Sequence, residues 1–397
     1  MSPSELEQRT WHAFHLAARW RKGISTPRRT LFIQGTSNKS VSDVRFIPGH
    51  SGTLILTTSK RIWDVFEIWD ISSPSEPRMA CEWSPRGATF NGIALNMDET
   101  SEATLAVSVL QNNGEHTVQL LSLEIDLLGG ASLRTICAIM SELKPTRLHD
   151  NRLAISDDVG RTEVWDWRVR KSAVLQEPAH QNGDWRPNRS IEVVFAHQSI
   201  LVVRASSICL FADPELHAVP ETSTPIAQHS FGWIDGVSVS STSAALSFLV
   251  RSESDDPWAS TAHSLDLYTL LRSTENGGHP GYVFPPHLDM RIPAVRGALR
   301  CRTVVLGHCG TAVWIQPRER AIVGLAEGDA VVAAGGRESL VVAALPGAFT
   351  QLEGGRTAWN NRIYSNHWNS WTALDYDEEM GRVVLCSSFA GVLVLEL

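Results

Sequence analysis

The sequence predicts an all-β protein, a seven-bladed β-propeller preceded by one short α-helix. From about Arg29 onward, short apolar or alternating segments recur at roughly ten-residue spacing, separated by clusters of Gly, Pro, Asn, Asp and Ser. Helical periodicity is confined to the N-terminal segment. Strands this regular, with no helices between them, indicate a sandwich, a barrel or a propeller. A repeat within the chain favours the propeller.

Composition and charge indicate a globular protein and argue against some kinds of binding surface. The 397 residues are 43% hydrophobic and 20% charged, which is typical of a globular protein. A chain of this length can bury a large core without disulfides or metals. Its net charge of −8 argues against a nucleic-acid-binding or anionic-membrane surface, since both need clustered positive charge.

The cysteines occur singly and form no Cys-x-x-Cys pair. They are Cys81, Cys137, Cys209, Cys301, Cys309 and Cys386. This pattern indicates reduced thiols in a cytoplasmic or nuclear protein rather than a disulfide framework or a zinc site. Glu5, Glu7 and Arg9 interrupt any apolar run at the N-terminus, so we expect no signal peptide. No apolar run is long enough for a membrane span.

Residues 1–23 are predicted to form an amphipathic helix, and residues 24–397 the propeller. Ser2-Pro3-Ser4-Glu5 has the pattern of a capping box with proline at the first helical position. Gly23 is the expected end of the helix. The apolar stripe at helical spacing is Leu6, Thr10, Trp11, Phe14, Ala17 and Ala18.

Two segments carry the repeat. One runs Ser156-Asp157-Asp158-Val-Gly160 and ends in Trp165-Asp166, and the other ends in Trp69-Asp70. In both, an acidic or glycine residue suits a tight hairpin turn, and the aromatic residue is expected to lie between neighbouring blades. We therefore predict that Trp165 is buried, that Asp158 and Asp166 make turn hydrogen bonds, and that Trp69 and Asp70 are their counterparts. Weaker copies are 207–213, 264–269 and 388–396.

The repeat and the strand pattern place the blades. The expected bounds are 41–85, 87–140, 143–180, 188–234, 235–293, 298–350 and 371–397. The last of these contains only three strands. We expect Arg29–Gln34 to supply the fourth and to close the ring, which would remove two free sheet edges.

Several tryptophans fall in loops that a propeller brings to one face. Loops from the second to the third strand of a blade, and from the fourth strand to the next blade, share that face. By the bounds above, they contain Trp63, Trp185, Trp258, Trp359 and Trp368, with Arg186 and Arg362 beside them. Because Trp and Arg are over-represented in binding hot spots, we predict a composite partner-binding site. Packing under its own loop is the alternative for any one of these tryptophans.

No catalytic motif is present, so no catalytic residue, metal or cofactor is expected. The sequence lacks a Gly-x-Ser-x-Gly elbow, a phosphate-binding loop, a His-Glu-x-x-His pair and a dinucleotide fingerprint. His12 and His15 are more typical of a helix face, and Asp255-Asp256 of a solvated loop. A propeller enzyme of lactonase or glycosidase type would need carboxylates or histidines converging on the central channel, and the spacing indicates none. A propeller that binds sugars or small ligands on its tryptophan loops is a further alternative, which near-identical blades would favour; these blades diverge.

Two motifs carry a family resemblance. The segment from Ser156 to Asp166 resembles the blade signature of WD-repeat proteins. Ala18-Arg19-Trp20-Arg21-Lys22-Gly23 resembles the junction in F-box/WD-repeat proteins, and the helix around Trp11 resembles the linker that follows an F-box. Leu306-Gly-His308 with Trp314-Ile resembles the divergent propellers of fungal F-box proteins.

This resemblance implies a monomeric protein-interaction scaffold, the substrate-recognition module of an F-box-type ubiquitin ligase adaptor. Its partner would be a ligase substrate. The residues before Trp11 leave no room for the F-box itself. A link to a cullin–RING ligase is therefore expected only if an F-box is supplied upstream.

Overall fold

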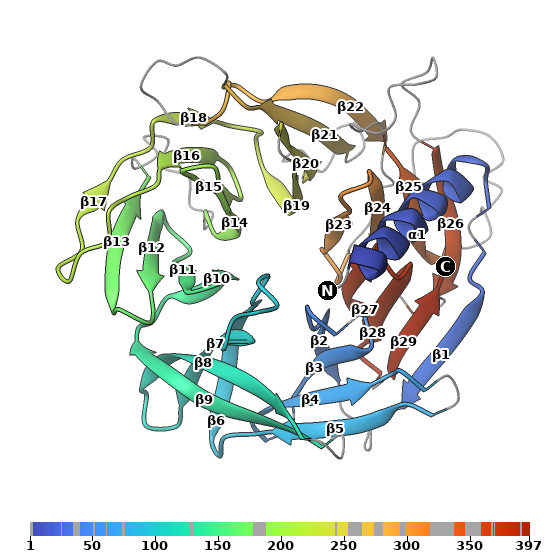
Figure 1. The fold of residues 1–397 in the computed structure, drawn as a ribbon, viewed down its shortest axis with the longest axis horizontal. Helices are drawn as coiled ribbons and strands as arrows, with labels where there is room; N and C mark the ends of the chain where they lie inside the picture. The colour runs from blue at the N-terminus through green and yellow to red at the C-terminus, as the bar shows by residue number, and fades with distance from the viewer. Residues whose placement is uncertain are drawn as a thin grey trace, which may run out of the picture.

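The described residues form seven antiparallel sheets arranged as blades around a central axis (Figure 1). The computed structural model describes residues 3–24, 26–34, 40–50, 52–60, 62–73, 76–126, 130–177, 188–242, 244–252, 264–273, 281–293, 299–317, 337–345, 359–366, 368, 370–389 and 391–397. The predicted seven-bladed propeller is thereby confirmed.

The first four blades follow one another along the chain. The first is β2 (Val41–Phe46), β3 (Leu54–Lys60), β4 (Asp64–Asp70) and β5 (Arg78–Trp83); the second is β6 (Ala88–Leu95), β7 (Leu105–Gln111), β8 (His116–Ile125) and β9 (Ala131–Met140). The third is β10 (Lys144–His149), β11 (Arg152–Ser156), β12 (Arg161–Asp166) and β13 (Lys171–Gln176); the fourth is β14 (Ser190–Ala196), β15 (Ser199–Arg204), β16 (Ile208–Ala212) and β18 (Ala227–His229).

The last three blades complete the ring. The fifth is β19 (Ile234–Ser241), β20 (Ala245–Ser252), β21 (Ser264–Leu271) and β22 (His287–Pro293); the sixth is β23 (Val304–Leu306), β24 (Thr311–Gln316), β25 (Glu338–Ala344) and β26 (Trp359–Asn366). The seventh is β27 (Trp371–Asp377), β28 (Arg382–Ser387), β29 (Gly391–Glu396) and β1 (Arg29–Gln34).

The ring closes as the sequence predicts. Strand β1 pairs antiparallel with β29, from Arg29 opposite Glu396 to Gln34 opposite Gly391. The outermost strand of the last blade thus comes from the N-terminal end of the chain, next to the C-terminal strands (Figure 1). Pairing the two ends covers the strand edge that an open blade would expose.

Two blades differ from the predicted bounds. The sixth blade does not end at 350, because its outer strand is β26 at Trp359–Asn366. The third blade gains a fifth strand, β17 (Thr222–Ser223), which lies parallel to β13 and belongs in sequence to the fourth blade. In Figure 1 this segment leaves β16, crosses to the outer edge of β13 and returns as β18.

The core is divided among the interfaces between blades. Each pair of neighbouring blades has its own apolar cluster, made by alternate residues of their strands. Trp69 lies in the cluster between the seventh and first blades, and Trp167 in that between the second and third. Because each blade buries its faces only against its neighbours, loss of one interface opens the ring.

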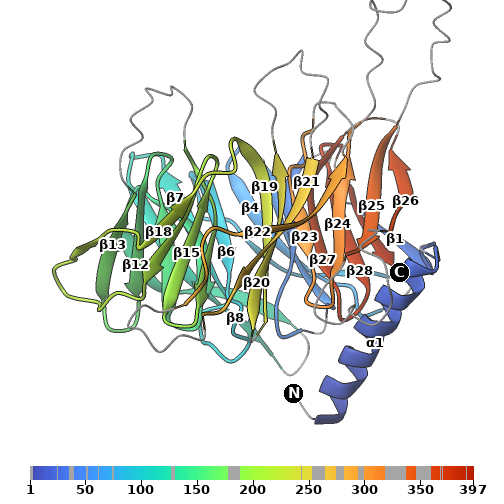
Figure 2. The same cartoon turned by 90° about the horizontal axis from the view of Figure 1, so that it is seen from above.

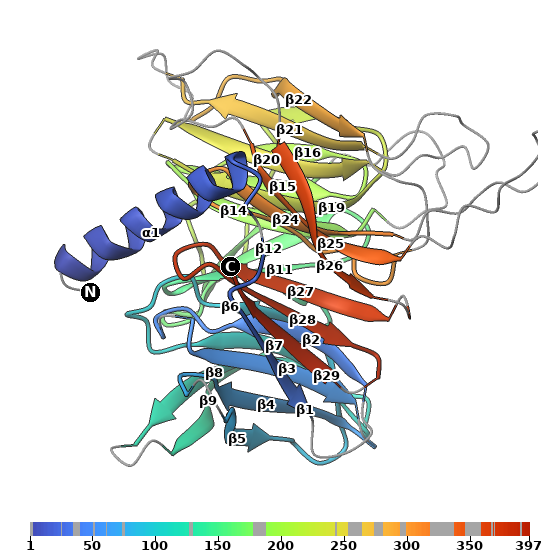
Figure 3. The same ribbon diagram turned by 90° about the vertical axis from the view of Figure 1, so that its right-hand side faces the viewer.

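Helix α1 (Pro3–Arg21) packs against the sixth and seventh blades. Gly23, at φ +78°, ends it as predicted, and its N–H donates to Trp20 O. Trp20 is fully buried and stacks on Tyr376 with ring centroids 6.0 Å apart. The N-terminal half of α1 projects past one face of the ring (Figures 2 and 3). No helical segment in the described ranges has the length and hydropathy that a membrane span requires.

The buried stripe of α1 shares only Ala17 with the predicted one. The residues that face the propeller are Ala13, Leu16, Ala17 and Trp20, whereas Leu6, Trp11 and Phe14 are exposed. Both stripes have helical spacing, so periodicity alone could not choose between them. On the buried stripe, Leu16 and Trp20 enter the apolar cluster between the sixth and seventh blades.

Candidate partner-binding face

Because neighbouring strands of a blade run in opposite directions, successive connections lie at opposite ends of the strands. The ring therefore has two different faces. The loop face carries the second-to-third-strand loops and the connections between blades, and includes Trp63 and Trp368. The turn face carries the remaining turns, and α1 lies on that side. Arg9 forms an ion pair with Glu379 at 2.8 Å, and Gly381 lies against His12 and Leu16. Glu379 and Gly381 belong to the β27–β28 turn.

Of the five tryptophans of the predicted site, Trp63 and Trp368 lie in described loops. Trp63, in the β3–β4 loop, is half-buried, and Trp368, between β26 and β27, is 77% exposed. These two lie on the same face, as predicted from their loops. Trp185, Arg186 and Trp258 lie outside the described residues.

Two further members of the predicted site are in a strand rather than a loop. Trp359 begins β26 and pairs with Ala344, and Arg362 lies within the same strand. Arg362 is exposed, and its Nε donates to Gln316 Oε1 at 3.2 Å. The error follows from ending the sixth blade too early, which left its outer strand unassigned.

An exposed aromatic pair stands on the loop face. The rings of Trp368 and Phe389 lie edge to face, with centroids 6.4 Å apart, and Phe389 is 70% exposed. The Ser370 and Ser387 hydroxyls hydrogen-bond at 2.8 Å and join the two loops. The Trp368 N–H donates to Asn366 Oδ1 at 3.0 Å. Polar contacts thus hold two large apolar side chains at the surface, and such side chains are common anchors of protein partners.

Arg300 adds a positive charge to this pair. It is exposed, and its Nη1 donates to Ser388 Oγ at 3.4 Å, beside Phe389. Within the described ranges it forms no ion pair. Sequence analysis missed both Phe389 and Arg300. The signal for Phe389 was its position near the start of the weaker repeat copy 388–396, ahead of that copy's last strand.

Below the aromatic pair, Glu338 is a buried carboxylate with one unsatisfied oxygen. Its Oε2 accepts from Asn366 Nδ2 at 3.1 Å and from Trp371 N at 3.3 Å. Its Oε1 is buried and has no hydrogen-bond partner in the described part of the chain. Desolvation by burial raises the pKa of Glu338 above its ordinary value near 4.5.

This shift makes stability depend on pH, and Glu338→Gln should remove that dependence. Since the pKa is higher in the folded than in the unfolded protein, the folded state binds more protons, and the free energy of unfolding falls as pH rises above about 4.5. Glu338→Gln should therefore gain stability relative to wild type between pH 4 and pH 7, measured by urea denaturation. The exposed Glu102→Gln is the control. If the difference in unfolding free energy between Glu338→Gln and wild type stayed constant from pH 4 to pH 7, the prediction would be contradicted.

A buried network holds the two ends of the segment that contains Trp185. The Arg204 side chain is 1% exposed, and its Nε lies 3.4 Å from Glu177 Oε2. Its Nη1 donates to Asn188 O at 3.1 Å and its Nη2 to Thr162 Oγ1 at 2.9 Å. Desolvation lowers the pKa of Arg204 from its ordinary value. Glu177 and Asn188 flank residues 178–187, so one arginine fixes both ends of this connection.

The repeat aspartates have the predicted turn role at two of three positions. Asp70 Oδ1 accepts from Ser72 N at 2.8 Å, and Asp166 Oδ1 accepts from Arg168 N at 3.0 Å. Asp158 does not make the predicted turn bonds and instead pairs with Lys144 at 2.7 Å. Its neighbour Asp157 accepts the turn N–H groups of residues 159–161. Because this turn has one additional residue, Asp157 accepts the turn hydrogen bonds in place of Asp158.

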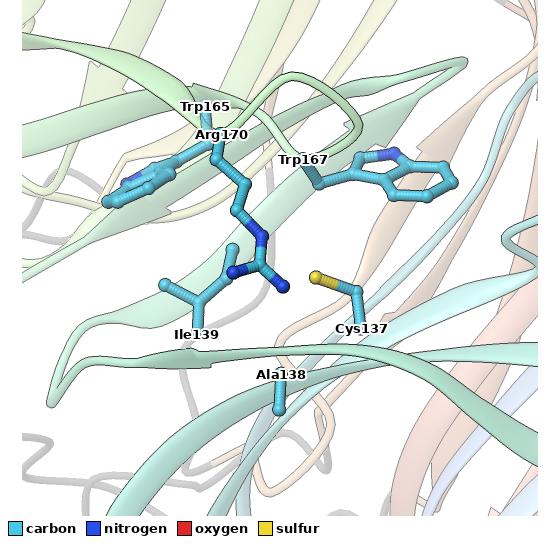
Figure 4. Close-up of a pocket in the computed structure, with 6 residues that line it drawn as sticks. All are labelled: Cys137, Ala138, Ile139, Trp165, Trp167 and Arg170. Carbon is cyan, nitrogen blue, oxygen red and sulfur yellow. The ribbon is translucent and has the colours of Figure 1, made fainter. Parts of the chain in front are cut away.

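Trp165 is half-buried, which corrects the prediction of a buried tryptophan. Its Nε1 donates to Glu163 Oε2 at 2.9 Å, and one side of the indole borders a surface pocket (Figure 4). Of the opposing strand β9, Cys137 and Ile139 point toward this space, whereas Ala138 points away from it (Figure 4). Trp167, two residues on, is the tryptophan buried between these blades.

Charged side chains converge on the channel, contrary to the expectation from sequence spacing. They lie on innermost strands: Asp43 and Arg45 on β2, Arg147 on β10, Glu192 on β14 and Asp375 on β27. Arg45 and Glu192 interact electrostatically from the first and fourth blades, so both face the channel. Burial raises the pKa of Glu192 and of Asp375.

Each of these carboxylates has a partner within the propeller. Arg45 lies 3.2 Å from Asp43, and Arg147 lies 3.3 Å from Glu192. Asp375 accepts from the N–H of Phe46 at 2.8 Å, a bond that connects the last blade to the first. The group is a network of two arginines and three carboxylates that connects the innermost strands of four blades.

Comparisons with known proteins support the architecture. No family model matches the sequence, and no curated protein matches it. Among solved structures, the chain resembles the β-propeller domain of Cps50 (Swd1) from Myceliophteria thermophila, with a TM-score of 0.53 and 9% sequence identity. The alignment covers 94% of this chain and 99% of that one. The chain is a seven-bladed β-propeller. An identity this low shows the fold alone.

Proposed function

We propose that this propeller is a protein-interaction scaffold whose loop face binds a partner protein. The observation that carries the proposal is the Trp368–Phe389 pair, 77% and 70% exposed on neighbouring loops. Monomeric proteins rarely leave large apolar side chains together at the surface without a binding role. Arg300, with no ion-pair partner in the described ranges, adds a charge for selectivity at the edge of the pair.

More specifically, we propose that the chain is the substrate-recognition module of an F-box-type ubiquitin ligase adaptor. The junction residues Arg19 to Gly23 support this, because they form the end of α1 and lead directly into the closing strand β1. The exposed Trp11 and Phe14 on α1 suit a contact with a preceding domain. An enzymatic role is less well supported, since the channel carboxylates are engaged by arginines and backbone N–H groups.

Affinity purification with mass spectrometry, using the chain with an F-box supplied upstream, tests both levels of the proposal. Trp368→Ala with Phe389→Ala should lose a partner that wild type retains, because aromatic anchors contribute about 2 kcal/mol or more each. Trp11→Ala with Phe14→Ala is the matched control on the other face and should keep that partner while losing ligase subunits. Equal partner recovery by all three proteins would refute the loop-face site. Absence of ligase subunits from wild type would refute the adaptor role alone.

A further inference from the structure

We propose that the outer edge of β9 is a second docking site, for an extended acidic segment of a partner protein. The segment would add a strand to the second blade and place an aromatic side chain in the neighbouring pocket. This surface lies on the outer wall of the ring, so it goes beyond the loop-face site and stands independently of it.

Among the described strands, none pairs with the outer edge of β9, and this edge is long. In the second sheet the strand order is β6-β7-β8-β9, and β9 runs for 10 residues along the rim of the ring (Figure 1). Ser141 N donates to His116 O, which fixes the phase of the β8–β9 ladder. Alternation then directs the N–H and C=O groups of Ala138 and Met140 outward, away from β8. An edge of this kind is a template for pairing with another strand.

The protein already uses this mode of pairing one blade away. Strand β17 lies along the outer edge of β13, with Thr222 opposite Val174 and Ser223 opposite Leu175. An intramolecular segment thus covers the third blade, whereas no described strand covers β9.

The pocket beside β9 has the size and lining for one aromatic side chain. Its volume is about 170 Å³, close to the roughly 150 Å³ of a cavity that holds benzene. Cys137, Ala138 and Ile139 of β9 form one wall, and Trp165 and Trp167 face them (Figure 4). Arg170 reaches down between the two indoles. A ring entering this space can stack on indole and guanidinium surfaces.

Charge around the pocket selects an acidic segment. Arg168, Arg170 and Lys171 are exposed in or beside one turn, and within the described ranges none of them has an acidic side-chain partner. Arg168 instead covers the outer face of Trp167, 5.0 Å from the ring centroid. Arg170 has φ +56°, a conformation that a non-glycine residue adopts at some energetic cost. The cations favour Asp or Glu residues on either side of the aromatic anchor.

A random-peptide phage display selection on the full chain tests this site. Enriched peptides should combine an aromatic residue with flanking Asp or Glu. Arg170→Gly and Ala138→Pro should each weaken such a peptide about tenfold or more. Arg170→Gly removes the guanidinium at a position where glycine is unstrained, and Ala138→Pro removes an outward N–H, a change that edge strands accommodate. Fluorescence titration gives the dissociation constants.

Two controls separate this site from the loop face and from a small-molecule site. Gln198→Gly replaces another residue with positive φ, in the fourth blade, and should bind peptide like wild type. Trp368→Ala should also leave peptide binding unchanged, so the two sites can fail separately. No enriched peptide, or peptides that bind both test variants like wild type, would overturn the proposal. Benzoate binding without peptide binding would overturn it as well, by assigning the pocket to a small anion.

Discussion

Deletion of residues 1–35 should convert the protein from a monomer into aggregates or lower its melting temperature severely. The deletion removes β1 and so exposes the edge of β29 from Gly391 to Glu396. It also removes Leu16 and Trp20 from the apolar cluster between the sixth and seventh blades. Loss of one large buried aromatic alone costs about 3–5 kcal/mol, a large fraction of a typical domain's stability. Size-exclusion chromatography and thermal melting measure the outcome.

Deletion of residues 1–8 is the matched control. It leaves the Arg9–Glu379 ion pair, the buried stripe of α1 and the whole of β1 in place. The described side chains that it removes, those of residues 6–8, are exposed. This shorter deletion should melt close to wild type. A monomeric 1–35 deletion with an unchanged melting temperature would show that the closing strand is dispensable.

Substitution of Arg204 should strongly destabilise the protein, because this arginine is buried and pairs with a buried carboxylate. Arg204→Met leaves Glu177 as a buried carboxylate without its cation, and removes the donors to Asn188 O and Thr162 Oγ1. Breaking a buried pair in this way costs about 3–5 kcal/mol. Urea denaturation should show this loss, and adding Glu177→Gln should recover part of it, because the second change neutralises the stranded charge.

Arg152→Met is the control for Arg204→Met. Arg152 forms an ion pair too, a bidentate one with Asp213 at 2.6 and 2.9 Å, but at the surface. Exposed ion pairs of this kind contribute about 1 kcal/mol or less. Equal losses for the two arginine variants would mean that burial of Arg204 is unimportant for stability.

The local pattern of the sequence predicted most of the fold. Alternating apolar strands, the turn residues and the two Trp-Asp endings predicted seven blades, and the strand count predicted closure by Arg29–Gln34. The sixth blade was predicted poorly, since its outer strand β26 is separated from β25 by a long segment and has no repeat signature. Sequence therefore predicted best the features that depend on neighbours within one hairpin.

The candidate sites depended on contacts that a linear pattern does not contain. Phe389 and Trp368 meet because the connection from β26 to β27 and the turn from β28 to β29 lie on one face and are joined by Ser370 and Ser387. The pocket at Trp165 lies where strand β9 of the second blade meets residues 165–170 of the third. Neither pair of elements is adjacent in sequence.

By itself, then, the sequence determined that this protein is a closed ring of β-hairpins with an amphipathic N-terminal helix. These features follow from side-chain alternation and turn chemistry, which act over a few residues. The tertiary structure alone decided which stripe of the helix is buried, which tryptophan fills an interface and which charges meet. Those choices rest on the fit between surfaces of different blades, where the size of one side chain sets the burial of another.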